Sequence, residues 1–327
     1  MESKLVEIRV EGKTRKVPSI CIDGRRIIVI GKWIKRAAVQ DEDLDEGKAI
    51  ENPEFLISEL KQGKLNADMF TFAQKLSDPK PKHQYYMEWD NAAVIPLKDF
   101  SDWWEKRLSQ DTRRNVRRAA KMGVTVKTAR FDDDLVKGIV KIYDETAVRQ
   151  GKPFWHYRKG FEVVKSEAGT YLDRSEFIGA YFGDALIGFI KLTYGNGCAH
   201  IIHILSKEEH TDKRPTNALI AKAVEVCVSR GLSYLTYCKY IDGGNEKSAL
   251  TEFKRRNGFE QLLYPRYFVP LTVKGRIALR LRFHHGWRNA LPKGLVPILL
   301  NLRAWFFSFA YRKTARSGAE NISQSAS

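Results

Sequence analysis

The hydrophobic pattern of the first part of the chain predicts short strands and one helix. Residues 20–31 (ICIDGRRIIVIG) place an Asp-Gly pair between two β-branched runs. This pattern is typical of a β-hairpin, because such turns need positive φ at both central residues. Residues 52–63 predict a helix, since Asn52 can cap it, Pro53 suits its first position and Gly63 can end it. The N-terminal region is therefore expected to mix strands with helix.

The next segment predicts a strand followed by two helices. Residues 85–97 (YYMEWDNAAVIPL) read as a strand, and residues 101–108 (SDWWEKRL) predict a short helix capped by Ser101. A second helix follows and ends at Gly123. Its basic side chains share one arc of roughly 140°, opposite the apolar ones. They are Arg113, Arg114, Arg117, Arg118 and Lys121. This helix is expected to carry a concentrated basic face.

The order of elements from residue 124 onward indicates the fold. It reads strand, two helices, three strands, helix, strand, helix and strand, up to about residue 271. Tight turns at residues 183–184 and 195–197 join the three central strands, which predicts an antiparallel meander. The order predicts a mixed α/β (α+β) fold with one meander followed by crossover helices.

Composition adds a constraint on partners. The chain of 327 residues is long enough for two domains, and its 43% hydrophobic and 29% charged residues fit a globular protein. Its net charge of +17 indicates attraction to polyanions such as nucleic acid, an acidic membrane surface or phosphorylated substrates. The alternative is that the basic residues only solvate the surface.

The cysteines and the N-terminus bear on the compartment. Cys21, Cys198, Cys227 and Cys238 form no C-x-x-C pair or cluster, so we expect reduced, mostly buried thiols, without a disulfide framework or a zinc site. The first residues alternate charged with apolar side chains and do not read as a secretory signal. A cytoplasmic location is therefore expected.

The element order over residues 124–271 is similar to that of the GNAT acyltransferases, and ALTEFKRRNGFEQLLYPRY at 249–267 resembles the C-terminal segment of that family. TRRNVRRAAKMGV at 112–124 resembles the basic helix of the Fem-type aminoacyltransferases, which pair two GNAT-like units in one chain. The resemblance implies that residues 1–123 form a degenerate first unit. Residues 272–315 would then be a basic aromatic tail, and residues 316–327, which lack apolar periodicity, are expected to be disordered.

The resemblance implies acyl-CoA as donor, but the usual glycine-rich pyrophosphate turn is missing from residues 210–223 (HTDKRPTNALIAKA). A helix starting near Pro215 still offers unpaired backbone N–H groups to an anion. The candidate cofactor-binding residues at this helix start are Lys213, Arg214, Thr216 and Asn217. Alternatively, Thr216 or Asn217 only caps the helix and the basic pair is solvated.

A second departure from the family concerns the general acid. GNAT enzymes often carry a Tyr four residues before the Gly of the Gly-Phe pair, and this chain has Lys254 there. The acid must come from elsewhere, and Tyr240 is our preferred candidate. In CKYIDGGN at 238–245, Lys239 and Asp242 would lie where the amine substrate and the thioester meet.

Aromatic and histidine residues give further candidates. In FWHY at 154–157, Trp155 and Tyr157 can bind a planar or acyl group and His156 can titrate near neutrality, unless the cluster is a lid packed over the core. His203 is a candidate base or a hydrogen-bonded core residue. His200 lies three residues before it, so on a regular strand the two point to opposite faces and cannot share a metal. No metal site is expected.

The tail from residue 274 to 313 is basic and aromatic. Its stretch LVPILLNLRAWFFSFAY is 17 residues long, but Pro297, Asn301 and Arg303 interrupt it. It suits an interfacial helix or a hydrophobic flap better than a membrane span. Peripheral contact with an anionic membrane at its inner face is therefore expected through the tail.

The function expected from the resemblance is transfer of an acyl or aminoacyl group from acyl-CoA or aminoacyl-tRNA to an amine acceptor, such as a cell-envelope precursor. The amine would attack the carbonyl directly, and a backbone N–H of the splayed meander strand would stabilise the oxyanion. The alternative is a non-catalytic module that binds RNA or an anionic membrane surface through the basic helix at 113–121 and the tail. The sequence does not indicate the oligomeric state.

Overall fold

The first part of the chain is built mostly of strands. The computed structural model describes residues 3–10, 13–44, 50–63, 65–149, 151–195, 197–241 and 246–285. The elements of the first part are, in chain order, β1 (Lys4–Val10), β2 (Lys13–Ile22), β3 (Arg25–Ile30), β4 (Arg36–Val39), the 3-10 turn η1 (Glu42–Leu44), α1 (Pro53–Lys61), β5 (Met69–Ala73) and β6 (Tyr86–Pro96).

The second part alternates helices with a strand meander. Its elements up to the meander are α2 (Phe100–Asp102), the π-helical turn η3 (Trp103–Arg107), α3 (Gln110–Lys121), β7 (Val124–Ala129), α4 (Asp133–Tyr143), β8 (Val148–Arg149), β9 (Lys152–Pro153), α5 (Phe161–Ala168) and η4 (Leu172–Arg174). The remaining elements are β10 (Ser175–Phe182), β11 (Ala185–Gly195), β12 (Cys198–Ser206), η5 (Thr211–Lys213), α6 (Pro215–Ser229), β13 (Tyr234–Thr236), α7 (Ala249–Arg256), β14 (Glu260–Pro270), α8 (Val273–Arg280) and η6 (Phe283–His285).

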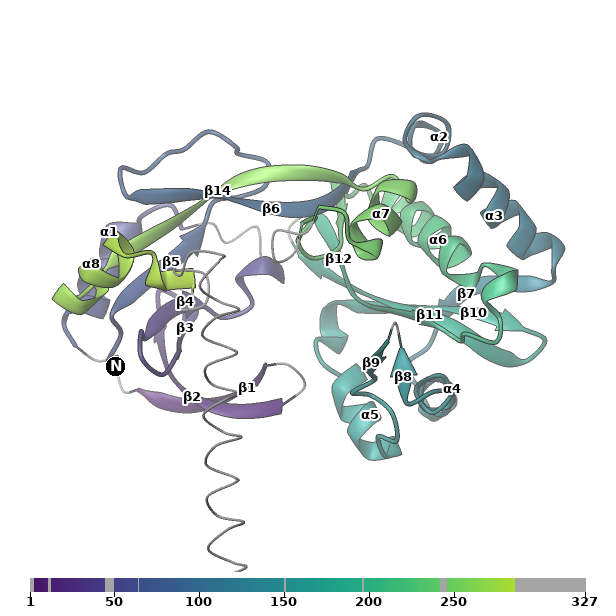
Figure 1. Cartoon of the computed structure of the whole chain (residues 1–327), viewed down its shortest axis with the longest axis horizontal. Coiled ribbons are helices and arrows are strands. Elements are labelled where there is room, and N and C mark those ends of the chain that lie inside the picture. The colour runs from purple at the N-terminus through teal and green to yellow at the C-terminus, as the bar shows by residue number, and fades with distance from the viewer. Residues whose placement is uncertain are drawn as a thin grey trace, which may run out of the picture.

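One long sheet runs through both parts of the molecule. Among the described strands, twelve follow the order β1-β2-β3-β4-β5-β14-β6-β13-β12-β11-β10-β7. Figure 1 shows two lobes, one with the strands β1–β5 and the other with the meander. The strands β6 and β14 run from one lobe to the other. The sheet is mostly antiparallel, and β4–β5 and β12–β13 pair in parallel. The mixed α+β fold with a meander and crossover helices is therefore confirmed.

The strand β14 returns from the end of the second part into the first. It pairs antiparallel with β5 on one side and with β6 on the other. On its far side, β6 pairs with β13 of the second part, where Leu235 lies opposite Ile95. These pairings make the sheet continuous across the two lobes.

Helices cover both faces of the meander. One core cluster joins β10–β12 to α6 and includes Ile190, Leu192 and Leu219. On the other face, a second cluster joins the same strands to α4 and α5 through residues such as Ile139, Val164 and Phe189. A third core lies in the first part, between α1 and its strands. Each lobe therefore buries its own apolar core.

Several local predictions are confirmed. Asp23 and Gly24 have φ values of 50° and 70° in the β2–β3 turn, as the hairpin requires. Asn52 caps α1 by accepting from the backbone N–H of Phe55 at 3.4 Å. The cap predicted at Ser101 is wrong. Asp99 caps α2 instead, because its extended backbone lets its carboxylate accept from the N–H of Asp102 at 2.7 Å.

The prediction that His200 and His203 point to opposite faces is wrong. The register of β11 and β12 shifts between Lys191 and Leu192, so that His200 pairs with Thr193 and His203 with Lys191. Lys191 and Thr193 are two residues apart on β11 and share a face, so their partners share that face too. The extra residue in β12 is Ile202. A β-bulge therefore reverses the expected alternation.

The thiols are only partly as expected. All four cysteines are free, but Cys21 and Cys238 are exposed whereas Cys198 and Cys227 are buried. In the described part of the chain, no three His, Cys, Asp or Glu side chains gather as a metal site would require. No helix in the same residues is both long and apolar enough to cross a membrane. The predicted interfacial stretch of the tail lies outside the described residues.

Candidate active site

The strands β12 and β13 separate after a short parallel pairing. They pair only from Cys198 to His200, with Thr236 opposite His200. After Thr236 the chain stays with β6, because the N–H of Tyr237 donates to Ala93 O and the N–H of Ala93 donates to Cys238 O, both at 2.9 Å. Among the described strands, none pairs with this edge of β12 beyond His200. Backbone groups of β12 are thus available at the point where the strands part.

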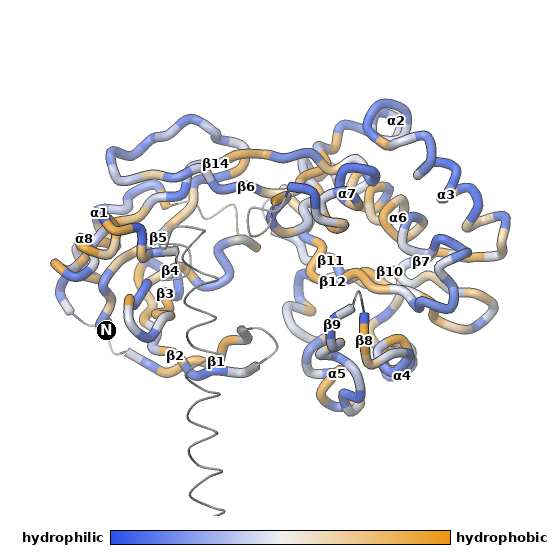
Figure 2. Tube along the Cα trace, viewed as in Figure 1, coloured by the Kyte–Doolittle hydropathy of each residue, from blue (hydrophilic) through white to orange (hydrophobic). Residues whose placement is uncertain are grey.

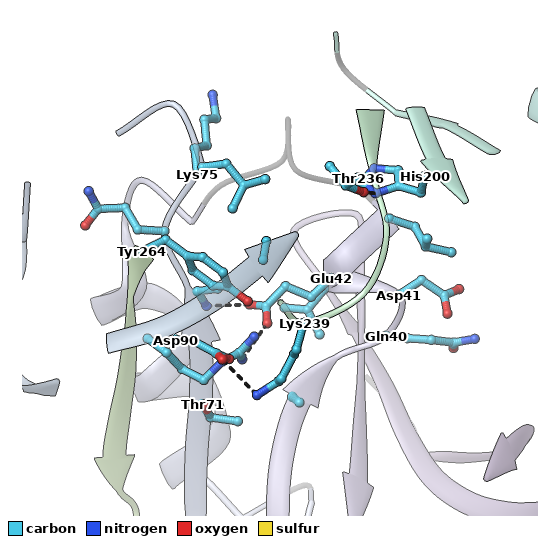
Figure 3. A pocket seen from close by; sticks show the side chains of 18 of the residues that line it. Gln40, Asp41, Glu42, Thr71, Lys75, Asp90, His200, Thr236, Lys239 and Tyr264 are labelled. Atoms are coloured by element: carbon cyan, nitrogen blue, oxygen red, sulfur yellow. Dashed lines mark hydrogen bonds and ion pairs between the residues drawn. The ribbon is translucent and has the colours of Figure 1, made fainter. Parts of the chain in front are cut away.

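A large cavity lies beside this point, between the two lobes. Its volume is about 1270 Å³, and both parts of the chain contribute to its wall. Figure 3 shows Glu42, Asp90 and Lys239 converging on one part of the wall, while His200 and Thr236 lie together on another. The size is sufficient for a substrate larger than a single amino acid.

A network of charges crosses the cavity wall. Arg266 on β14 donates from Nε to Asp90 Oδ2 and from one terminal nitrogen to Glu42 Oε2, each at 2.8 Å. Lys239 Nζ donates to the other oxygen of Asp90 at 2.7 Å. Burial alone raises the pKa of the Asp90 carboxyl, but the bond from Lys239 and the charge of Arg266 outweigh it, so this pKa lies below its usual value. Asp90 is therefore an anion held between two cations.

Arginine side chains of the first lobe add positive charge to the cavity wall. Arg36 lines the cavity, and burial together with the neighbouring charge of Arg266 lowers its pKa. Its guanidinium donates to the backbone oxygen of His284 at 3.0 Å. Arg25 and Arg26 line the same wall. The cavity is thus suited to a ligand with anionic as well as amine groups.

His200 and Thr236 form a buried pair on the cavity wall. Thr236 Oγ1 and His200 Nδ1 are 2.7 Å apart, and the two residues are 5% and 6% exposed. The hydroxyl fixes the orientation of the imidazole, because only one edge of the ring can meet it. Sequence reasoning considered His200 only as half of a metal pair and missed its place at the strand separation.

The start of α6 differs from a regular capped helix. Arg214 is the N-cap residue with φ of 56°, and no side chain caps the helix. Thr216 shares a hydrogen bond with Ser206 at 2.8 Å, and Asn217 donates to Asn257 at 3.0 Å. Neither residue therefore acts as a cap. Lys213 lies over the ring of Phe182, with Nζ 4.9 Å from the ring centroid. The first backbone N–H groups of α6 remain available for an anion.

Residues 237–241 lead from the strand separation toward α7. Lys239 and Ile241 line the cavity, whereas Tyr240 packs against the core cluster beside α6. Lys254 is 1% exposed and donates to the backbone oxygen of Lys239. Lys254 therefore holds this segment in place. It cannot supply the phenol of the Tyr that the GNAT family often has at this position. The predicted substrate residue Asp242 lies outside the described residues.

The FWHY segment forms a cluster on the α4 and α5 side of the sheet. His156 stacks between Trp155 and His203, with ring centroids 3.5 and 5.0 Å away, and Tyr143 shares a hydrogen bond with His203 Nδ1 at 3.2 Å. Burial and the charges of nearby lysines lower the pKa of His203 to about 4. Arg158 lies over the ring of Tyr157. Of the described residues that line the cavity, none belongs to this cluster.

The residues that sequence reasoning missed come from distant segments. Asp90, Glu42 and Arg266 meet only because β14 lies beside β6 and η1 reaches the same wall. Asp90 has one sequence signal, because it is a charged residue inside residues 85–97, which otherwise read as a strand.

Comparisons with known proteins agree with this geometry. Residues 106–255 match the family model described as an acetyltransferase (GNAT) domain. A crystal structure of FemX aligns with a TM-score of 0.55 and 10% identity over 85% of this chain and 90% of that chain. The C-terminal domain of a putative lysylphosphatidylglycerol synthetase from Agrobacterium fabrum aligns with a TM-score of 0.52 and 12% identity, over 81% of this chain and 87% of that one. No curated protein sequence matches the chain.

Residues 106–255 therefore form an acetyltransferase (GNAT) domain, and the fold of the chain is similar to that of FemX. The meander, the separation of β12 and β13 and the helix α6 all lie within this domain. In general terms this domain is that of an acyltransferase.

Proposed function

We propose that the protein is an N-acyltransferase whose amine acceptor binds in the cavity between the two lobes. The observation that carries the proposal is that the cavity opens on the His200–Thr236 pair, where β12 and β13 part. At this point the amine of the acceptor and the carbonyl of the donor can come into contact, because no strand lies between them. The domain limits at residues 123 and 271 are part of the same proposal.

The donor is acyl-CoA or aminoacyl-tRNA, with its anionic part at the start of α6. Both donors carry phosphates, and the uncapped N–H groups and positive dipole of α6 favour such groups. Lys213, Arg214, Thr216 and Asn217 stand at or beside this helix start. A donor that runs from α6 along β12 places its reactive carbonyl near the free edge of that strand.

The acceptor amine is held by the acidic groups of the cavity. Asp90 and Glu42 are anions that pair with Arg266, and an incoming ammonium can compete for them. The arginines of the first lobe then bind an anionic group elsewhere on the acceptor. A cell-envelope precursor that carries both an amine and phosphate or carboxylate groups fits this requirement.

His200 is proposed as the general base. It removes a proton from the ammonium, and the free amine attacks the donor carbonyl. A backbone N–H of β12 stabilises the resulting oxyanion. The C–N bond forms, the bond to the thiol or ribose oxygen breaks, and the leaving group takes a proton for which Tyr240 is the proposed donor. His203 and His156 remain alternative catalytic candidates, and Trp155 and Tyr157 remain candidate substrate contacts.

Mass spectrometry of reaction mixtures tests the proposal. The full chain is incubated with acyl-CoA or aminoacyl-tRNA and a panel of amines, and the products are analysed for an amide mass. His200→Asn should lower kcat by a factor of about 10² to 10⁴, whereas His203→Gln, outside the cavity, should retain most activity. The proposal fails if neither donor is consumed, or if His203→Gln is the variant that loses activity.

A further inference from the structure

The outer side of α8 is apolar where a surface helix is usually polar. Val273, Ile277 and Leu281 follow one another at intervals of four residues and are 62%, 55% and 53% exposed. They lie on one stripe of the helix, because residues four apart are neighbours at about 100° per residue. Figure 2 shows α8 at the outer end of the first lobe, with apolar (orange) positions along it.

Trp33 extends this apolar stripe. Its side chain is 59% exposed and meets the ring of Phe283 edge-on, with centroids 5.2 Å apart. A shallow cavity of about 470 Å³ lies between these residues, lined by Trp33, Ile34, Val273, Ile277, Leu281 and Phe283. The stripe of α8 and the side chains of Trp33, Ile34 and Phe283 thus form one continuous surface, which we call the α8 face.

The packing of α8 explains why this face points outward. Gly275 lies so close to Asp68 that an added Cβ would meet its backbone oxygen at 1.8 Å. Ala278 is also buried, and Thr272 both caps the helix and donates to Asp68 Oδ1 at 3.2 Å. The small residues face the sheet, so the larger apolar side chains of α8 face the solvent.

Positive charge borders the α8 face. Exposed basic side chains stand on both sides of the apolar stripe. They are Lys274, Arg276, Arg280 and Arg282. The sequence contains no Asp or Glu from Leu271 to Ala319. The only acidic group that the structure pairs with these cations in the described residues is Asp68, 3.3 Å from Lys274.

We propose that the α8 face binds the surface of an anionic lipid bilayer. Apolar side chains and a tryptophan that enter the interface, bordered by Lys and Arg that meet lipid phosphates, are the features of a helix lying in the membrane plane. The uniform positive charge disfavours a second copy of the same face, since like charges would oppose one another. The surface is formed by described residues, namely Trp33 and Ile34 of the first lobe and residues 273–283 at the start of the basic aromatic tail.

Vesicle binding by the full chain tests this proposal. The wild type should sediment with vesicles of phosphatidylcholine and phosphatidylglycerol, and should bind pure phosphatidylcholine much more weakly. Ile277→Glu combined with Leu281→Glu should lower the affinity for the anionic vesicles at least about tenfold. Arg276→Glu with Arg280→Glu should also weaken binding, and this effect should fade at high salt. The matched control is Val163→Glu on α5, a similarly exposed apolar residue, at 46%, in the other lobe.

The possible results of these binding experiments distinguish a lipid bilayer from other partners of the α8 face. Unchanged binding by the Ile277/Leu281 variant, with wild-type thermal stability, would overturn the proposal and assign binding to another part of the chain, such as residues 286–315 of the tail. A wild-type dimer that this variant converts to a monomer, with vesicle binding unaffected, would assign the face to a second copy. Equal binding to neutral and anionic vesicles would also contradict it. Because all substituted side chains are exposed, each variant is expected to fold.

Discussion

Arg266 and Asp90 join two strands that belong to different parts of the sequence. The guanidinium Nε donates to Asp90 Oδ2 at 2.8 Å, across β14 and β6. Since Arg266 also reaches Glu42 and Asp90 also reaches Lys239, this pair links the first lobe to the segment that leaves the strand separation. A single change here is expected to affect both stability and acceptor binding.

Asp90→Asn should raise KM for the amine acceptor and lower the free energy of unfolding by about 1–3 kcal/mol. The carboxylate has a lowered pKa, so its contribution to stability is complete above its unfolded pKa of about 3.9 and is lost as pH falls through the folded pKa. Urea unfolding at several pH values measures this. The wild type and Asp90→Asn should converge in acid, and a constant difference at every pH would contradict the ion-pair explanation.

Thr236→Val should lower kcat about tenfold and leave KM almost unchanged, because the hydroxyl orients His200. Thr236→Ser keeps the hydroxyl and should restore most of the activity. The pH profile of kcat distinguishes this positioning role from a structural one, since only the former moves the profile. Equal kcat in Thr236→Val and the wild type would argue against His200 as the base.

Acid should destabilise the second lobe through His203. Its folded pKa of about 4 lies below the ordinary value of 6.5, so the neutral ring is favoured in the folded state. Its contribution is complete above pH 6.5 and is lost as pH falls toward 4, by about 3 kcal/mol in total. His203→Gln should flatten the dependence of unfolding free energy on pH in this window. The same slope in both proteins would disprove it.

Gly258→Ala should destabilise the protein by about 1–3 kcal/mol. The residue has φ of +81°, and an added Cβ would lie 2.8 Å from Trp103 Nε1. That indole is fully buried and donates to Asn257 O at 3.1 Å, so it has little freedom to move. Thermal unfolding measures the loss. Gly160→Ala, at the N-cap of α5 with a negative φ and open space around it, is the control and should destabilise the protein less than Gly258→Ala does.

Turns and helix caps were predictable from the sequence because they depend on residues that are adjacent in the chain. The Asp23-Gly24 turn and the Asn52 cap each depend on a few adjacent residues. The bulge at Ile202 depends instead on how β11 and β12 pair, and the short β13 depends on competition from β6. Neither cause is visible in the alternation of apolar residues. The domain limits at residues 123 and 271 come from the order of elements and stay a prediction. The family model matches residues 106–255.

The candidate site was harder to predict than the fold. The sequence indicated the start of α6, which contacts the end of β12 through Thr216 and Ser206, and Lys239, which lines the cavity. It also favoured His203 and His156, which the structure brings together beside α4 and α5, outside the cavity lining. Residues that approach only through sheet pairing, such as Arg266 and Asp90, leave no spacing signal. The alternative of an RNA-binding basic helix remains untested, although Arg113 donates to Trp104 O and Glu105 O within the molecule.

The return of β14 has a consequence for synthesis on the ribosome. While the nascent chain grows, β6 has neither of its neighbours, because β13 and β14 are both translated much later. The first lobe cannot finish folding until residue 270 has emerged from the exit tunnel. Until then its bare strand edges are open to wrong pairing with other chains. The sheet that joins both lobes is therefore expected to close only after β14 has been translated, and a chaperone that shields strand edges should raise the yield.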